Sequence, residues 1–196
     1  MLDRMTDRSV DRFVVQTSKL AGLQVITRQP IVDARGWFER AYCADTFAEL
    51  GITKTISQIN RSFTAQKGSI RGMHFQTAPF AETKFVSCLK GEVFDVAVDL
   101  RAGSPTFLQW HGEILSADNQ RSLLIPEGFA HGFQTLSADC EMLYLHTQKF
   151  DPASSSGVNP LDPRLAIEWP LTITEMTEMS EGDRHRPMML PTFEGL

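Results

Sequence analysis

Strict alternation of side chains over residues 92–100 constrains the fold more than any other feature of this chain. In an extended segment Phe94, Val96, Val98 and Leu100 share one face, and Asp95, Ala97 and Asp99 share the other. A β-prone run over residues 84–89 precedes it, and because Gly91 lies at the connection, the two runs predict a hairpin. Further β-prone runs at 109–115, 122–125 and 141–148, separated by Gly, Pro, Asp and Asn, predict an all-β sandwich or barrel.

The chain length of 196 residues predicts one domain with a substantial core. Residues 1–13 are polar and without pattern, so we expect a flexible N-terminal arm followed by a single domain over residues 14–196. Residues 45–51 predict a short helix, with Asp45 as its N-cap and Gly51 as its terminator.

The charge and composition of the chain argue against several classes of function. A net charge of −5 without a long basic run argues against binding to nucleic acid. No apolar stretch is long enough to cross a bilayer, and residues 1–8 are too charged for a signal peptide. Three cysteines without C-x-x-C spacing make a disulfide framework improbable and favour the reducing cytoplasm.

Two histidine motifs lie among the predicted strands. Gly68-x5-His74-x-Gln76 with Lys84 and Gly91, followed by Pro126-x-Gly-x2-His131, resembles the paired motifs of the cupin fold, a jelly-roll barrel (double-stranded β-helix). Gln76 stands where the pattern has a second imidazole, and Lys84 stands where it has a carboxylate. Because a lysine cation repels a divalent metal and an amide binds one poorly, we expect proton chemistry rather than metal chemistry at this site.

Several side chains should face one cavity. His74 is a candidate base, because free imidazoles take up a proton near neutrality, and the Lys84 ammonium could stabilise an enolate. Tyr144 shares a face with His146 and could donate a proton, or simply pack as an aromatic residue. Asp95, a polar residue on a half-buried strand, needs a partner, and His131 is the simplest one.

Between residues 33 and 187 the chain resembles the dTDP-4-dehydrorhamnose 3,5-epimerase family, sugar-nucleotide epimerases of cupin fold. The resemblance rests on the following segments: Asp33-x-Arg-Gly-x-Phe-x-Arg40, Gln58-x-Asn60-x-Ser62, Arg71-Gly-Met-His-Phe-Gln76, Asp95-Val-Ala-Val-Asp-Leu-Arg101, Gly103-Ser-Pro-Thr-Phe107, Pro126-Glu-Gly-Phe-Ala-His-Gly-Phe133, Asp162-Pro163, Trp169-Pro170 and Ser180-Glu-x-Asp183.

The resemblance assigns roles to individual positions. His74 matches the general base, Asp183 the acid paired with it, Tyr144 the acid on the opposite face and Lys84 the cation near the sugar carbonyl. Asp95 and His131 match a supporting pair. Positions that bind substrate, some reached from the partner subunit of a homodimer, are matched by Arg35, Glu39, Gln58, Asn60 and Arg71, and Phe150 matches an aromatic position.

The resemblance implies an isomerase that inverts C3, C5 or both in a nucleoside-diphosphate 4-keto-6-deoxyhexose, with dTDP as the expected nucleotide. It also implies that the enzyme works without a metal or an organic cofactor. The proton would leave through an enolate and return from the other face. Three alternatives remain open: a 3-epimerase or ketoisomerase on a related 4-keto sugar, a metal-dependent cupin using His74 and His131, and a sugar-binding cupin without activity.

Overall fold

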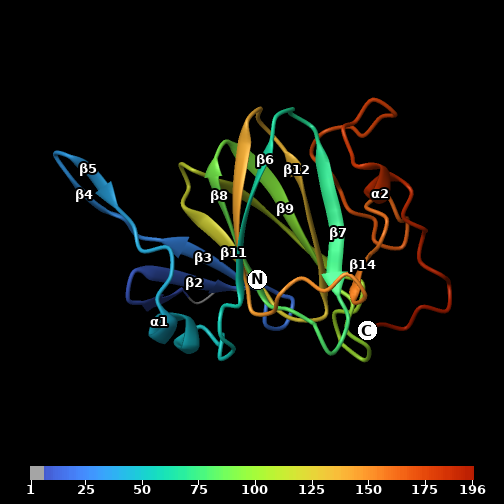
Figure 1. Ribbon diagram of the computed structural model, residues 1–196, viewed down its shortest axis with the longest axis horizontal. Coiled ribbons are helices and arrows are strands. Elements are labelled where there is room, and N and C mark those ends of the chain that lie inside the picture. The colour runs from blue at the N-terminus through green and yellow to red at the C-terminus, as the bar shows by residue number, and fades with distance from the viewer. Residues whose placement is uncertain (1–6) are drawn as a thin grey trace, which may run out of the picture.

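The structure, a computed structural model, describes residues 7–196, in which two antiparallel β-sheets face each other (Figure 1). In order across the larger sheet its seven strands are β1 (Arg8–Val10), β2 (Phe13–Thr17), β3 (Gln24–Arg28), β11 (Arg121–Ile125), β8 (Lys84–Lys90), β13 (Cys140–His146) and β6 (Gln58–Thr64). The smaller sheet has five strands in the order β10 (Trp110–Ser116), β9 (Glu92–Asp99), β12 (Phe129–Thr135), β7 (Ile70–Gln76) and β14 (Ser155–Gly157). The predicted all-β architecture is therefore confirmed.

The core fills three spaces. Between the sheets lie Val86, Val93, Leu115, Phe133 and Met142, among others. Helix α1 (Ala44–Glu49) packs Phe47 against the outer face of the larger sheet, beside Phe85 and Leu145. The C-terminal segment covers the outer face of the smaller sheet with Leu165, Trp169 and Phe193. The alternation of side chains in β9 had predicted burial on one face only. Because the C-terminal segment covers the other face, β9 is buried on both.

The predicted hairpin of residues 84–100 is wrong in its pairing. Both strands exist, but β8 pairs with β11 and β13 in the larger sheet, whereas β9 pairs with β10 and β12 in the smaller one. Gly91, with φ of 77°, therefore turns the chain from one sheet into the other. The strands predicted at 109–115, 122–125 and 141–148 are confirmed as β10, β11 and β13, and β11 ends directly before Pro126.

Two predictions at the N-terminal side need correction. Within the expected flexible arm, residues 8–10 form β1, which pairs with β2 and buries Val10. Residues 1–6 of that arm lie outside the described residues. The predicted short helix is present, but its N-cap is Cys43 rather than Asp45, which lies in the first turn.

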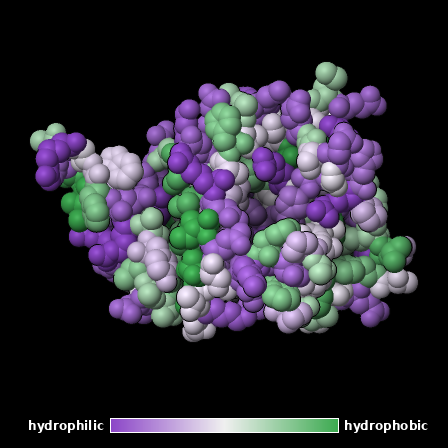
Figure 2. All heavy atoms as spheres, in the orientation of Figure 1, coloured by the Kyte–Doolittle hydropathy of each residue, from purple (hydrophilic) through white to green (hydrophobic). Residues whose placement is uncertain are grey.

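A two-stranded arm of β4 (Ile31–Asp33) and β5 (Gly36–Phe38) projects from the body at the left of Figure 1. Its side chains Val32, Trp37 and Phe38 are 72%, 65% and 66% exposed. Figure 2 shows hydrophobic as well as hydrophilic residues on this projection. The arm thus carries apolar surface that the described residues of this chain leave uncovered.

Candidate active site

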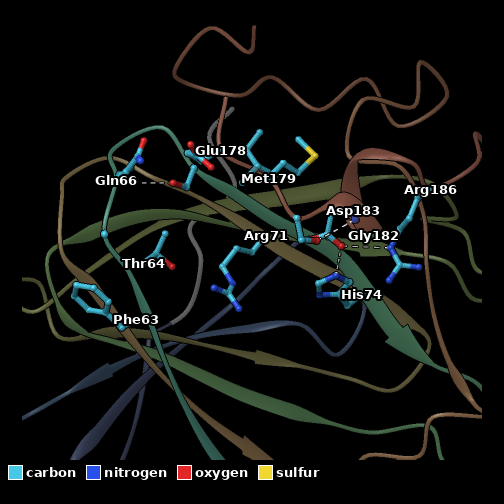
Figure 3. Close-up of a pocket in the computed structure, with 14 residues that line it drawn as sticks. Phe63, Thr64, Gln66, Arg71, His74, Glu178, Met179, Gly182, Asp183 and Arg186 are labelled. Atoms are coloured by element: carbon cyan, nitrogen blue, oxygen red, sulfur yellow. Dashed lines mark hydrogen bonds and ion pairs between the residues drawn. The ribbon is translucent and has the colours of Figure 1, made fainter. Parts of the chain in front are cut away.

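A cavity of about 510 Å³ opens between the sheets. We call it the histidine cavity, because its walls include His74, His131 and His146, together with Asn60, Ser62, Arg71, Lys84, Phe133 and Tyr144. A second hollow of about 620 Å³, the outer cavity, shares Arg71 and His74 with it and extends to the C-terminal segment at residues 178–186 (Figure 3). Arg71 and His74 thus lie where the two hollows adjoin.

A β-bulge in β7 places Arg71 and His74 in the same cavity. Residues three apart on a regular strand face opposite sides, but here Gly72 and Met73 together oppose Gly132 alone on β12. Two glycines allow the strands to approach this closely. A Cβ on Gly72 would lie 2.6 Å from the Cα of Gly132, and a Cβ on Gly132 would lie 2.6 Å from the sulfur of Met73.

The sequence around residue 183 forms a short helix that presents a buried carboxylate to His74. Helix α2 (Glu181–Arg184) is capped by Ser180, whose hydroxyl accepts a hydrogen bond from the Asp183 backbone N–H. Asp183 Oδ1 lies 2.5 Å from His74 Nε2, and Oδ2 accepts a hydrogen bond from the Gly72 N–H at 3.3 Å. The predicted pairing of His74 with Asp183 is therefore present (Figure 3).

The charge state of Asp183 fixes the tautomer of His74. Burial would raise the pKa of Asp183, but the hydrogen bond and charge of His74 and the Gly72 N–H outweigh it and lower that pKa. A carboxylate only accepts hydrogen bonds, so Nε2 of His74 donates to Asp183, and in the neutral imidazole Nδ1 is the nitrogen that can accept a proton. Because the His74 side chain is 44% exposed, a ligand in the cavity can reach it.

Lys84, the first residue of β8, is buried and lines the histidine cavity. Its Nζ donates a hydrogen bond to the backbone oxygen of His74 at 3.2 Å and lies 3.3 Å from Oε1 of Glu82. The ammonium is thus held next to the candidate base, where it could stabilise negative charge on a substrate oxygen.

Tyr144 lies across the cavity on β13, with its hydroxyl 3.0 Å from the Ser62 hydroxyl. Its ring meets His131 edge-on at 6.2 Å and stacks on His146 at 6.1 Å. Burial raises the pKa of Tyr144, so the phenol keeps its proton at neutral pH. A protonated phenol in this position is a potential proton donor.

His131 and Asp95 form the predicted pair, with His131 Nε2 at 3.0 Å and 2.9 Å from the two carboxylate oxygens. Asp95 is fully buried, and His131 is only 5% exposed. The pair therefore satisfies the requirement that a buried carboxylate has a partner.

A third imidazole–carboxylate pair was not predicted. His146 Nδ1 lies 2.8 Å from Oε2 of Glu82, whose other oxygen faces Lys84. Burial would raise the pKa of Glu82, but His146 and Lys84 lower it, so the group is a carboxylate. Glu82 precedes β8 by two residues, and this spacing from Lys84 is the sequence signal that could have identified it.

The structure places only some of the predicted substrate-binding residues at the histidine cavity. Arg71 and Asn60 line the histidine cavity, and Gln58 contacts its edge by donating a hydrogen bond to Asn60. Gln58 also accepts one from the backbone N–H of Phe150, whose ring is 58% exposed. The other two predicted positions lie elsewhere.

Arg35 and Glu39 do not reach the histidine cavity of their own chain. Arg35 lies on the projecting arm, where it pairs with Asp33 and is 89% exposed. Glu39 forms an ion pair with Arg28, at 2.5 Å, in which both side chains are largely buried. Arg35 and Glu39 are therefore absent from the residues that line the two cavities around His74.

Gln76, at the position of a second imidazole in the cupin pattern, turns away from the histidine cavity. Its amide donates to the backbone oxygens of Phe80 and Lys149 and accepts from the Asp151 N–H. Among residues 7–196 no cluster of three or more His, Cys, Asp or Glu side chains has a geometry that could hold a metal ion. The same residues contain no helix long and apolar enough to span a membrane.

Comparison with known proteins identifies related sequences over most of the chain. The family model described as dTDP-4-dehydrorhamnose 3,5-epimerase matches residues 17–190. The dTDP-4-dehydrorhamnose 3,5-epimerase of Salmonella typhimurium is 45% identical over 174 residues, which cover 87% of this chain and 93% of that protein. The dTDP-4-dehydrorhamnose 3-epimerase of Streptomyces niveus is 42% identical, with 77% of this chain and 73% of that protein covered.

A solved structure of a related enzyme has the same fold. A crystal structure of the Legionella pneumophila enzyme dTDP-6-deoxy-D-glucose-3,5-epimerase, in complex with dTDP-4-keto-L-rhamnose, superposes with a TM-score of 0.84. It is 43% identical, and the alignment covers 90% of this chain and 92% of that one. This likeness confirms the predicted cupin jelly-roll barrel. The chain therefore belongs to the dTDP-4-dehydrorhamnose 3,5-epimerase family of isomerases.

Proposed function

We propose that this protein inverts C3 and C5 of a dTDP-4-keto-6-deoxyhexose by removing a proton next to the ketone and returning one to the opposite face. The observation that carries the proposal is that one cavity is lined by His74 with its own carboxylate, by the ammonium of Lys84 and by Tyr144, with His74 on the smaller sheet and Tyr144 on the larger sheet that faces it. The C4 ketone acidifies the hydrogens on both neighbouring carbons, because the resulting carbanion delocalises onto O4.

The first step transfers a proton from carbon to His74. Nδ1 of the imidazole accepts the proton while Nε2 donates to Asp183, whose negative charge stabilises the imidazolium that forms. The electron pair of the broken C–H bond moves into the ring and makes the C4 oxygen an enolate. Lys84 stabilises that oxygen by donating a hydrogen bond from its ammonium.

The second step returns a proton from the other side. Tyr144 donates its phenolic proton to the carbon, and the stereocentre is inverted. Ser62, bonded to the Tyr144 hydroxyl and only partly buried, passes a proton from solvent to restore the phenol, while His74 releases its proton to solvent. Protons are thus balanced over one inversion without oxidation or reduction.

Binding of the dTDP part is assigned to the polar residues beside His74. Arg71 faces both cavities, and its guanidinium suits a diphosphate. Asn60 and Gln58 offer amides for a sugar or base. The related Legionella enzyme was crystallised with a dTDP-4-keto sugar, which supports the same class of substrate here.

The protein is proposed to act as a homodimer in the cytoplasm. The exposed apolar side chains of the projecting arm favour burial against a second copy, which would bring Arg35 to the partner's cavity. Cys88 and Cys140 are buried free thiols, as expected in a reducing compartment.

Subunit complementation tests the dimer. Homodimers of Arg35→Ala and of His74→Ala should both be weakly active, whereas mixed dimers containing one of each should regain activity in one of their two sites. A monomer by sedimentation at micromolar concentration, or no gain on mixing, would contradict this assembly.

Proton exchange tests the reaction. In D₂O the enzyme should introduce deuterium at C3 and C5 of dTDP-4-keto-6-deoxyglucose, visible by NMR as the loss of both proton signals. His74→Ala should slow both exchanges by about 10²–10⁴-fold while the variant stays folded. Absence of exchange by the wild type would refute the proposal.

A 3-epimerase is the second candidate, because the Streptomyces niveus 3-epimerase is 42% identical to this chain. It has the same first step but inverts one centre only. Deuterium at C3 with an unchanged C5 signal would select this candidate.

A further inference from the structure

The unpredicted pair Glu82–His146 connects two groups of the histidine cavity that the proposed reaction uses. One carboxylate oxygen of Glu82 lies 3.3 Å from Nζ of Lys84, and the other lies 2.8 Å from Nδ1 of His146. The Glu82 and His146 side chains are only 10% and 12% exposed. A buried carboxylate that bridges two donors holds both in fixed positions.

The tautomer of His146 is consistent with a bridging role. Because Glu82 is a carboxylate, Nδ1 of His146 donates to it, and Nε2 is left to accept a hydrogen bond from the Asn60 amide at 3.4 Å. Both ring nitrogens are therefore occupied. The ring is fixed in its plane and has no free nitrogen with which to act as a base.

Strand register explains why this ring supports Tyr144. On β13, His146 lies opposite Lys84 of β8, and Tyr144, two residues earlier on the same face, lies opposite Val86. The two rings of β13 are nearly parallel, with an interplanar angle of 25° and centroids 6.1 Å apart. His146 thus lies alongside the phenol, and His131 meets the same ring edge-on at 70°, with centroids 6.2 Å apart.

We propose that Glu82 and His146 are positioning residues: Glu82 holds the ammonium of Lys84, and His146 holds the ring of Tyr144 at the face where the second proton is delivered. The inference rests on the proposed function, since it assigns how that site is held in place. It predicts that the two residues control different parts of the reaction.

Lys84 and Tyr144 act at different moments, so the two effects are separable. Every proton removal needs the enolate to be stabilised, and loosening Lys84 should therefore slow exchange at C3 and C5 in parallel. Proton delivery from Tyr144 matters for inversion, and displacing its ring should lower inversion relative to exchange. A displacement of about 1 Å at a reacting group costs up to roughly 10²-fold in rate.

Three variants separate the contributions. Glu82→Gln keeps an acceptor for His146 but removes the charge beside Lys84. His146→Phe keeps a flat ring against Tyr144 but cannot bond to Glu82. His146→Ala removes both the ring and the hydrogen bond. His111→Ala is the matched control, because His111 also lies on a strand and pairs with a glutamate, Glu113 at 3.4 Å, but lines neither cavity.

The measurements are deuterium incorporation at C3 and C5 by NMR, the amount of inverted product, and kcat and KM separately. His146→Ala should lower the ratio of inversion to exchange about tenfold or more, and His146→Phe should keep this ratio within about threefold of wild type. Glu82→Gln should lower kcat for both carbons about tenfold or more with an unchanged ratio and KM. His111→Ala should match wild type.

Two results would overturn the inference: a wild-type inversion-to-exchange ratio in a folded His146→Ala, or a wild-type kcat in Glu82→Gln. If His146→Ala does not fold, His146→Phe provides the test. A lowered ratio of inversion to exchange in this variant would show that ring stacking does not hold Tyr144. These failures differ from failure of the proposed function, in which the wild-type protein itself exchanges neither hydrogen.

Discussion

The replacement Asp183→Asn tests how the base is oriented, because it changes charge and donor pattern while keeping shape. Oδ1 of Asp183 faces Nε2 of His74 at 2.5 Å and Nε of Arg186 at 3.5 Å, and Oδ2 faces the Gly72 N–H at 3.3 Å. All three neighbours are donors when Nε2 carries its proton. An asparagine has one acceptor oxygen, so its NH₂ must point at a donor on one side.

The size of the effect follows from the interaction that is lost. A hydrogen bond to a charged group contributes about 1.5–3 kcal/mol, and each 1.36 kcal/mol on the barrier is a factor of ten. The variant should therefore lose about 10–150-fold in kcat/KM. If the NH₂ faces His74, the imidazole must accept through Nε2 and carry its proton on Nδ1, which removes the base. The loss could then approach the roughly 10⁴-fold seen for the equivalent change in a Ser-His-Asp triad.

The assay is single-turnover deuterium incorporation at C3, with circular dichroism to verify folding and calorimetric titration with dTDP to verify binding. Glu181→Gln is the matched control: it removes the same charge from α2, but its side chain is 85% exposed, and it should leave the rate within about twofold of wild type. An Asp183→Asn variant that exchanges C3 within threefold of wild type would refute the view that this carboxylate orients His74.

Three further predictions concern other parts of the molecule. Lys84→Met should lower kcat by about 10²–10³-fold at both carbons, because the enolate oxygen loses a charged donor; initial rates by NMR measure this. Asp99→Asn should destabilise the protein by about 3 kcal/mol at pH 7. Burial would raise the pKa of Asp99, but hydrogen bonds from Arg101 and two hydroxyls lower it. The stabilisation that the ionised carboxylate provides is therefore complete above the unfolded-state pKa of about 3.9. It is lost as the pH falls through the lower pKa of the folded state. Urea unfolding at pH 7 and pH 3 should show the wild-type advantage shrinking at the lower pH. Gly132→Ala should cost about 1–3 kcal/mol, visible as a drop in Tm of roughly 2–12 °C, because its Cβ would overlap the sulfur of Met73.

The local sequence pattern was enough to predict most strands, but it did not predict which strands pair with one another. The alternation at residues 92–100 and the turn at Gly91 predicted two strands, and both exist. A tight hairpin and a corner between two sheets require the same local turn, so pattern alone could not distinguish them. The distinction depends on β11, β12 and β13, which lie far along the chain.

Site residues were predictable where a strand pattern placed them on a common face. Tyr144 and His146 follow from alternation, and Lys84 follows from its position in the first motif. Asp183 lies in a loop and short helix more than a hundred residues from His74, so only the family resemblance identified it. Glu82 was missed because it lies before the first residue of β8, so its two-residue spacing from Lys84 fell outside the predicted strand.

The arrangement of Arg71 and His74 shows a limit of the same reasoning. Ordinary period-two alternation would separate them, and only the paired strand β12 reveals the extra residue in β7. Similarly, the sequence pattern gave no sign that Arg35 lies on a projecting arm, away from the histidine cavity.

That extra residue also restricts how this enzyme could be redesigned or could diverge. Shortening β7 by one position between the guanidinium and the imidazole would rotate one of them out of the cavity, whatever side chains were chosen. The backbone length between Arg71 and His74 therefore sets the spacing of a guanidinium and an imidazole that share one cavity, and neither can shift along β7 without moving the other.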